Sequence, residues 1–351
     1  MKKLIFLIAS LLLCASCTAL PAEERAFAVA LGVSESGGTW EVSARVPTYQ
    51  SGGGYLTLTA QGHSLSEALA VLDATAPMQL HLGQIRVVVF SQGVAEASSF
   101  QSTLTELAMR REFRLQAQVC VTEDRVSDLM DRLEPATGSR LSKSLDVLLE
   151  TRVEQGVIPL AVLSDVLRRG ERQSWIAVHV ALEDTAGVTK VGMDESAGTQ
   201  SASGTGKVQF GGGWLIGQDG SAHGQLTAAE MQLLALMAGK LHKGTLSLDD
   251  GTVTLIDASS KVKLHGNTVA CDVSLRYGTS VMTEAGVQHA VTDACRNVIG
   301  KLAAAGCDAL GVGRQAIRSF PDMAAWHQLD WPVLYPQLNW ELTVLPQGSA
   351  S

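Results

Sequence analysis

The stretch Ile85-Arg86-Val87-Val88-Val89-Phe90 decides how the first half of this chain folds. It is a nearly continuous run of β-branched and aromatic residues, the side chains that favour a β-strand. A strand with alternating polar and apolar residues has one face in water, whereas an unbroken apolar run predicts a strand covered on both faces. We therefore expect this strand to lie inside a sheet that is packed on both sides.

The segments around this strand supply more strands and several helices. Upstream we expect strands over 27–33, 40–46 and 55–60, and Ser64 with Glu67 forms a capping-box pattern that predicts a helix start. Downstream the pattern predicts a helix over 94–109, a strand over 115–121 and a short helix that ends at Pro135. The order βββ-α-β-α-β-α indicates one mixed α/β domain.

The remainder of the chain is expected to form a middle region and a C-terminal domain. The middle region has predicted helices around 141–153 and 160–167, a strand over 175–182 and a Gly/Ser/Thr-rich linker over 185–206. The C-terminal region has a hairpin signal at Gly211-Gly212-Gly213, a helix over 228–237, strand pairs between 245 and 277, an amphipathic helix over 284–305 and a final strand over 339–345. We predict an α+β fold: multidomain mixed α/β with antiparallel or mixed sheets and three domains, over 17–135, 136–206 and 207–351.

Residues 1–16 have the layout of a secretory signal peptide. Lys2 and Lys3 precede an apolar run over 4–13, which is shorter than the roughly 20 residues of a membrane span. Small residues then lead to Cys17, as a lipoprotein signal peptidase requires, although Cys14 stands where Leu is usual. Cys14 itself follows the large Leu13 and is not expected to carry lipid. We predict cleavage before Cys17 and lipidation of Cys17; the alternative is an ordinary signal peptide that contains a cysteine.

Composition limits how the mature chain can associate with other molecules. The hydrophobic content of 46% is enough for a buried core, and the formal charge of −8 argues against binding to nucleic acid or to anionic lipid. Membrane contact is therefore expected to come from the lipid, and two or more acyl chains give a stable anchor. The expected location is a membrane surface outside the cytoplasm.

Two glycine-rich stretches imitate nucleotide-binding motifs. Gly311-Val312-Gly313-Arg314-Gln315-Ala316 matches a dinucleotide fingerprint, but it follows a predicted helix and too few residues remain for a βαβ unit. Its glycines are better explained by a tight turn at positive φ. In the stretch 201–207, Ser201 replaces the first glycine of a phosphate loop and Val208 replaces its Ser or Thr. We predict no catalytic, cofactor-binding or metal-binding residues, so the protein is not expected to be an enzyme.

The remaining chemically notable side chains have structural explanations. The eight histidines are scattered and are expected to be surface or satisfied core residues. Cys120, Cys271, Cys295 and Cys307 are expected to be buried free thiols, with Cys295 and Cys307 as the one pair to test for a disulfide. A final group of aromatic residues is expected to fill the last core, with a ligand pocket or partner surface as the alternative: Trp326, Trp331, Tyr335 and Trp340.

Several motifs together resemble the Ger(x)C family, the lipoprotein C subunit of nutrient germinant receptors in endospore-forming bacteria. The longest stretch runs from Cys307 through Asp308, the Gly311-Val312-Gly313 turn and Arg318, and is followed by Phe320-Pro321 and Tyr335-Pro336. Further matching stretches cover nearly the whole mature chain: 27–33, 81–89, 112–114 and 213–215. Thr18-Ala19 departs from the Trp-Asp that often follows the lipid cysteine in this family.

The resemblance implies three mixed α/β domains without known catalytic residues. It also implies membrane-embedded receptor subunits as partners, one of them transporter-like, and a place at the inner spore membrane. Two other classes were weighed: a substrate-binding lipoprotein of an importer and a lipid-anchored hydrolase. The importer class needs two lobes of alternating strands and helices, which the β-rich stretch 207–277 does not match.

Overall fold

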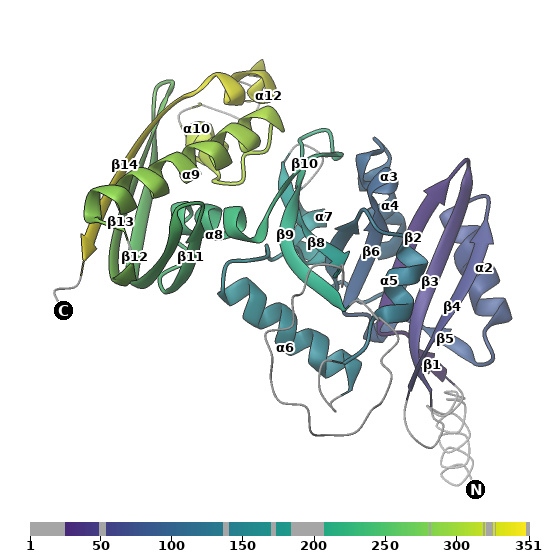
Figure 1. Ribbon diagram of the computed structural model, residues 1–351. Helices are drawn as coiled ribbons and strands as arrows, with labels where there is room; N and C mark the ends of the chain where they lie inside the picture. Colours follow the sequence, from purple (N-terminus) through teal and green to yellow (C-terminus); the bar gives the residue numbers. More distant parts are fainter. Residues whose placement is uncertain are drawn as a thin grey trace, which may run out of the picture.

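The structure is a computed structural model and describes residues 25–48, 54–135, 140–169, 173–183, 207–280, 282–318, 320, 326 and 328–348. It contains an eight-stranded sheet and a four-stranded sheet, each with helices against it, and a small parallel pair of strands (Figure 1). The predicted α+β, multidomain fold with mixed sheets is confirmed.

The eight-stranded sheet has the order β10-β9-β8-β7-β6-β2-β3-β4. Its four central strands run parallel and its edges are antiparallel. The strands are β2 (Ala30–Ser36), β3 (Thr39–Thr48), β4 (Gly54–Gly62), β6 (Val87–Ser91), β7 (Gln118–Thr122), β8 (Trp175–Leu182), β9 (Val208–Ile216) and β10 (Ala222–Leu226). The small parallel pair is β1 (Arg25–Phe27) with β5 (Gln79–His81).

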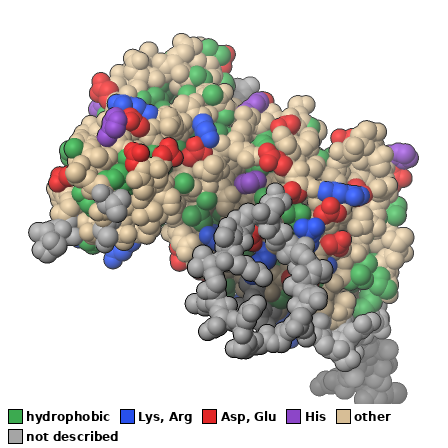
Figure 2. Space-filling view, in the orientation of Figure 1, with side chains coloured by type: hydrophobic (Ala, Val, Ile, Leu, Met, Phe, Trp, Pro, Cys, Tyr) green, Lys and Arg blue, Asp and Glu red, His purple; other side chains and the backbone are tan. Residues whose placement is uncertain are grey.

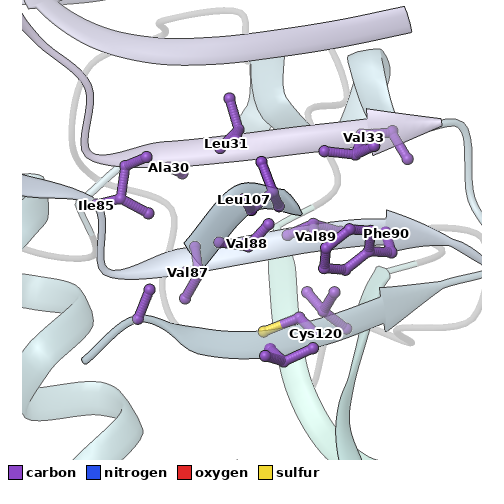
Figure 3. Close-up of a cluster of buried hydrophobic side chains, with 14 of the residues drawn as sticks. Ala30, Leu31, Val33, Ile85, Val87, Val88, Val89, Phe90, Leu107 and Cys120 are labelled. Carbon is purple, nitrogen blue, oxygen red and sulfur yellow. The ribbon is translucent and has the colours of Figure 1, made fainter. Parts of the chain in front are cut away.

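Strand β6 is buried on both faces, as the apolar run predicts. Val87, Val88, Val89 and Phe90 are each at most 1% exposed, although successive side chains point to opposite faces. Figure 3 shows them packed between Leu31 and Val33 of β2 and Cys120 of β7. The covering helices are α2 (Leu65–Thr75), α3 (Gln92–Glu96), α4 (Phe100–Ala108), α5 (Val126–Arg132), α6 (Leu141–Glu154) and α7 (Leu163–Arg169), and η2 (Leu82–Gln84) is a short 3-10 turn.

Two local predictions in this half were wrong in detail. The single helix expected over 94–109 is divided into α3 and α4, because Ala97 is extended and Ser98-Ser99 stands between them. At the start of α2, Oγ of Ser64 accepts the N–H of Glu67 as expected for an N-cap. The Glu67 carboxylate, however, accepts the N–H of His63 at 2.7 Å rather than that of Ser64. The helix therefore begins at the expected residue with a shifted capping pattern.

The expected hairpin at Gly211-Gly212-Gly213 was also wrong, because all three glycines lie inside strand β9. The neighbouring ladder shifts register between Val178 and Val180, so β8 and β9 do not pair evenly there. Gly212 has a φ of +95°, and a Cβ there would lie 2.4 Å from the carbonyl oxygen of Leu226. The glycines thus let a strand pass close to its neighbours instead of reversing it.

The four-stranded sheet has the order β11-β12-β13-β14. Strands β11 (Gly244–Leu248), β12 (Gly251–His265) and β13 (Thr268–Ser280) are antiparallel, and β14 (Asn339–Gly348) joins β13 in parallel. Helices α8 (Ala228–Met237) and α9 (Glu284–Ala304) pack in this half and contact each other. The short helices after α9 are α10 (Val312–Ile317), α12 (Trp331–Leu334) and the 3-10 turn η4 (Tyr335–Gln337).

Buried apolar residues form three clusters. The first extends from Ala26 to Ala222 and belongs to the eight-stranded sheet, the second surrounds α8, α9 and the four-stranded sheet, and the third is aromatic and lies around α10, α12 and η4. Strands from all three predicted segments, 17–135, 136–206 and 207–351, join the eight-stranded sheet. The division into domains at 135 and 206 stays a prediction about folding units.

Candidate functional site

The one functional residue predicted from the sequence, Cys17, lies outside the described residues, which begin at Arg25. The predicted signal peptide, residues 1–16, also lies outside them. Both therefore stay predictions. Within the described ranges, no helix is both long enough and apolar enough to cross a membrane.

A groove of about 1540 Å³ lies where the two large sheets meet. One side comes from the residues before β8 and after β9, including Arg169, Ser174 and Gly217. The other side comes from the end of α8, from β12 and from the turn after α9, which includes Asp308. Both halves of the described chain therefore contribute walls to this groove.

The turn after α9 fixes the two halves to each other. Helix α9 ends at Ala304. Gly306, two residues later, has a φ of +58°, and the next residue, Cys307, is fully buried. The Cys307 thiol donates to the carbonyl oxygen of Trp175 at 3.6 Å, and the Asp308 N–H donates to Oγ of Ser174 at 2.7 Å. Trp175 is the first residue of β8 and Ser174 precedes it, so these contacts join the turn after α9 to the start of a strand of the eight-stranded sheet.

The Asp308 carboxylate caps helix α10. Its Oδ1 accepts the N–H of Val312 at 2.8 Å and its Oδ2 accepts the N–H of Gly313 at 2.6 Å. Burial raises the pKa of Asp308, while these backbone hydrogen bonds oppose the shift. The Trp331 indole N–H also favours the charged form, although it makes no hydrogen bond of standard geometry.

The glycine fingerprint is a structural turn. Gly311 has a φ of +72° and precedes α10, which has only six residues and follows a helix rather than a strand. In a dinucleotide site the helix N–H groups bind the pyrophosphate. Here Asp308 occupies the N–H groups of Val312 and Gly313, so the geometry favours the structural explanation.

Position 313 requires a glycine because a side chain would not fit there, and not because of its backbone φ angle. Only Gly311 of the two glycines has a positive φ. A Cβ on Gly313 would lie 2.9 Å from Nε1 of Trp331 and 3.0 Å from Oδ2 of Asp308. The expectation that both Gly311 and Gly313 adopt a positive φ is therefore wrong for Gly313.

The C-terminal aromatic residues form a connected row of rings. Centroids are 5.5 Å apart for Phe320 and Trp326, 5.5 Å for Trp326 and Trp331, and 6.0 Å for Trp331 and Tyr335. Trp331 and Tyr335 are 5% and 1% exposed, which confirms the core interpretation for these two rings. Burial and the nearby Asp308 raise the pKa of Tyr335 well above its usual value.

Two arginines contribute to the walls of the groove. Arg169 and Arg314 both line it, and neither forms an ion pair with another described residue. Burial, and secondly the charge of Arg314, lower the pKa of Arg169. Asp219, Asp308 and Asp330 line the same groove, so its lining carries charges of both signs. The Asp308 carboxylate is already engaged in structural contacts.

Two of the described histidines and the four described cysteines have the structural roles expected of them. Nδ1 of His81 accepts the N–H of Gly83 at 3.0 Å, and Nε2 of the surface residue His223 lies 2.8 Å from Asp219. In the described part of the chain, no group of three or more His, Cys, Asp or Glu could hold a metal ion. Cys120, Cys271, Cys295 and Cys307 are free and buried, so no disulfide joins Cys295 to Cys307.

Two models of known protein families match this chain. A family model described as the spore germination protein N-terminal domain matches residues 19–175, and the model of the spore germination B3/GerAC-like C-terminal domain matches residues 211–345. The chain belongs to the Ger(x)C family of spore germination proteins. The family resemblance predicted from the sequence is thus confirmed over both halves of the chain.

A solved structure supports the fold of this Ger(x)C protein. A crystal structure of the GerBC protein is similar with a TM-score of 0.52 and 14% identity, covering 91% of this chain and 97% of that chain. No curated protein sequence matches the chain. Sequence reasoning did not assign structural roles to Asp308 and Ser174, which join the turn after α9 to the start of β8; the only sequence signal was an acidic residue shortly before a Gly-x-Gly turn.

Proposed function

We propose that this protein is the membrane-anchored, non-catalytic lipoprotein subunit of a nutrient germinant receptor and supports spore germination. The observation that carries the proposal is the pair of spore germination family matches over 19–175 and 211–345. The first match begins two residues after Cys17, so the family domain starts where the predicted mature chain starts.

Anchoring at Cys17 follows from the N-terminal sequence. The apolar run over 4–13 is too short to span a bilayer and ends at a small-residue cysteine site. A lipoprotein carries at least two acyl chains, which are enough for a stable anchor. The protein would then lie on the outer surface of the inner spore membrane.

A non-catalytic role is supported by what the reactive side chains of the turn after α9 already do. The Asp308 carboxylate accepts two backbone N–H groups, and the Cys307 thiol donates to a carbonyl oxygen. Burial raises the pKa of Cys307 to about 12, which keeps this thiol protonated and unreactive at neutral pH. These groups hold the two halves together and are poorly placed to attack a substrate.

The partners would be the membrane-embedded subunits of the same receptor, one of them transporter-like. The experiment is purification of the C-terminally tagged chain from spore membranes in mild detergent. We expect two multi-spanning germinant receptor subunits to co-purify, and deletion of the gene to abolish the response to a nutrient germinant. A different tagged lipoprotein of the same membrane serves as the control.

Recovery of an importer permease and its ATPase, with normal germination of the deletion strain, would contradict the proposal. That result would instead support a substrate-binding lipoprotein of an importer.

A further inference from the structure

A basic loop with exposed apolar side chains joins α4 to β7. This loop, residues 109–117, has the sequence MRREFRLQA, with three arginines and one glutamate in a chain whose formal charge is −8. Met109 is 81% exposed and Leu115 is 41% exposed. Arg111 is exposed and Arg110 is half-buried. The loop therefore presents cations and apolar groups side by side.

The loop is a fixed part of the folded body. Phe113 inserts into the core of the eight-stranded sheet. The carbonyl oxygen of Leu115 accepts the N–H of Ser164 at 2.9 Å, and that of Arg114 accepts the N–H of Ala117 at 3.1 Å. Met109 and Leu115 are thus held outward on a supported backbone.

The loop lies beside the strand with which the described chain begins. A Cβ on Gly83 would be 3.3 Å from the carbonyl oxygen of Glu112 in the loop and 2.6 Å from the ring of His81. The His81 ring lies 5.2 Å from that of Phe27, which pairs with it between β1 and β5. These contacts place the loop next to β1, which lies with β5 at the lower end of the sheet in Figure 1.

A second set of positive groups is found at the same place. Nε of Arg86 lies 3.4 Å from the Asp146 carboxylate, and Arg114 also experiences the charges of Arg86 and Asp146. The buried Nε atoms of Arg25, Arg86 and Arg114 lack hydrogen-bond partners in the described part of the chain. Glu150 and Glu154 line the same cavity as Arg86 and Asp146, so the charges of this cluster are balanced. The positive charge available to an anionic group is that of Arg110 and Arg111, for which no ion pair is found among the described residues.

The tether limits how far this region can lie from a membrane. Eight residue steps separate Cys17 from Arg25, and a fully extended chain spans at most about 28 Å over that length. This step rests on the proposed lipidation of Cys17. A lipid on Cys17 would therefore keep β1 and the adjacent loop close to the headgroups.

We propose that the 109–117 loop is a membrane-contact surface that binds anionic phospholipid headgroups. Its arginines lie at the level of the phosphates, and Met109 and Leu115 enter the interfacial layer. The net charge of the chain led us to expect no such binding, but charges further away than about 8–10 Å are screened at physiological ionic strength. Figure 2 shows acidic side chains scattered over both halves of the molecule, so the local charge of the loop decides the interaction.

The test uses the full mature chain from Thr18 to Ser351 without lipid, so the result does not depend on lipidation or on germination. Its sedimentation with phosphatidylglycerol-containing vesicles is compared with that of the variant carrying Arg110→Ser and Arg111→Ser. Each basic residue near an anionic surface contributes about 1 kcal/mol, so we expect binding to fall roughly 30-fold. The matched control carries Lys261→Ser and Lys263→Ser on exposed positions of β12 and should bind as the wild type does.

A fluorescent label reports whether the loop enters the membrane. The four native cysteines of the mature chain after Cys17 are buried, so a polarity-sensitive dye would label Met109→Cys selectively. Its emission should shift to the blue on addition of phosphatidylglycerol vesicles but not of phosphatidylcholine vesicles. The same dye on Val333→Cys, another exposed position at 55%, should not respond.

Equal binding to both kinds of vesicle, or equal binding by wild type and the Arg110/Arg111 variant, would overturn the proposal. The proposal would also be overturned if the wild type did not bind vesicles and the Arg110/Arg111 variant lost the membrane subunits from its purified complexes. That combination would identify the loop as a protein interface and would leave the proposed receptor role intact.

Discussion

Gly313, in the turn after α9, has too little room for a side chain. A Cβ there would meet both the indole of Trp331 and the carboxylate of Asp308 at 3.0 Å or less. We expect Gly313→Val to lower the free energy of unfolding by about 1–3 kcal/mol, because overpacking moves both groups from their places. Thermal unfolding of the full mature chain would show a lower Tm. Gly300→Ala on α9, where no atom lies within 4 Å, is the control and should be neutral or stabilising.

NAD titration of the same two proteins separates the structural explanation from a binding role. We expect no heat of binding in either. Saturable binding by the wild type that Gly313→Val abolishes without a change in Tm would disprove the structural explanation.

The same turn shows how far sequence reasoning reached at the residue scale. A tight turn after a long helix could be predicted, because glycines cluster where the apolar period stops. It could not be predicted that Gly311 adopts a positive φ whereas Gly313 is required by close packing. This difference depends on Trp331, which is 18 residues further along the chain than Gly313 and meets it only in the folded state.

The four buried cysteines give a prediction about pH. Burial raises the pKa of Cys271 to about 11 and the pKa values of Cys295 and Cys307 to about 12, and it also raises that of Cys120. The native chain from Thr18 should therefore react with no thiol reagent at pH 8, whereas the denatured chain exposes four thiols. Rapid modification of the native protein would contradict the buried geometry.

The sign of the accompanying stability change is fixed by linkage. A thiol with a raised pKa in the folded state contributes stability below its unfolded pKa of roughly 8.5, and that contribution is lost as the pH rises toward the folded value. The slope is up to about 1.4 kcal/mol per thiol and pH unit. The urea midpoint should fall between pH 9 and pH 10, and it should fall less steeply in Cys295→Ala, which has one thiol fewer.

At the scale of elements, Glu230 connects the two main helices of the C-terminal half. It completes the capping box of α8 by accepting the N–H of Thr227 at 2.8 Å, and it pairs with Lys301 of α9 at 2.8 Å. Burial acts to raise the pKa of Glu230, but hydrogen bonds from Lys301 and Thr227 outweigh it and the pKa is lowered. The carboxylate therefore stabilises the folded state above its unfolded pKa of 4.5, and this stability is lost as the pH falls through the folded value.

Two substitutions separate the cap from the ion pair. Glu230→Ala removes both and should cost about 1–2 kcal/mol. Glu230→Gln can keep the cap and should cost less than about 1 kcal/mol, since the partner Lys301 is partly exposed. The difference between wild type and Glu230→Gln in urea unfolding at pH 7 should vanish at pH 3. A difference that persists at pH 3 would mean that the ion pair is not its source.

Strand β9 shows why the element scale is harder to predict than the residue scale. Three consecutive glycines between apolar runs match a hairpin signal, yet the chain continues through them. The reason lies in other segments: Ile176 of β8 and Leu226 at the end of β10 approach the glycines too closely for side chains. The unbroken apolar run of β6 and the helical periodicity of α9 could be predicted because the residues of these segments themselves determine their burial.

At the scale of the whole molecule, the eight-stranded sheet takes strands from both sides of the linker predicted over 185–206. Strand β9, which follows that linker, pairs with β8, which precedes it. No local pattern in the sequence predicts this strand pairing, because it joins residues that are distant along the chain. The groove with Arg169, Ser174 and Asp308 could not be predicted for the same reason, since Asp308 lies more than 100 residues after the other two along the chain.

The anchor is the property of the whole molecule that the sequence predicts most directly. Cys17→Ala should abolish labelling of the protein by a palmitate analogue in cells, because Cys17 is the predicted acceptor. Cys14→Ala is the matched control and should still be labelled, since Leu13 makes Cys14 a poor cleavage site and Cys14 is removed with the leader.

The proposed membrane-contact loop also predicts how the Cys17→Ala protein distributes between the membrane and soluble fractions of cells. In Cys17→Ala the leader stays uncleaved or the chain stays unlipidated, so the acyl chains that hold the mature protein are missing. The 109–117 loop alone binds weakly and through charge, so any Cys17→Ala protein that remains on membranes through the loop should be released by high salt. Wild type should resist the same wash. Equal palmitate labelling of wild type and Cys17→Ala would show that the anchor lies elsewhere, and the 28 Å limit on the position of β1, about the reach of eight extended residues, would no longer hold.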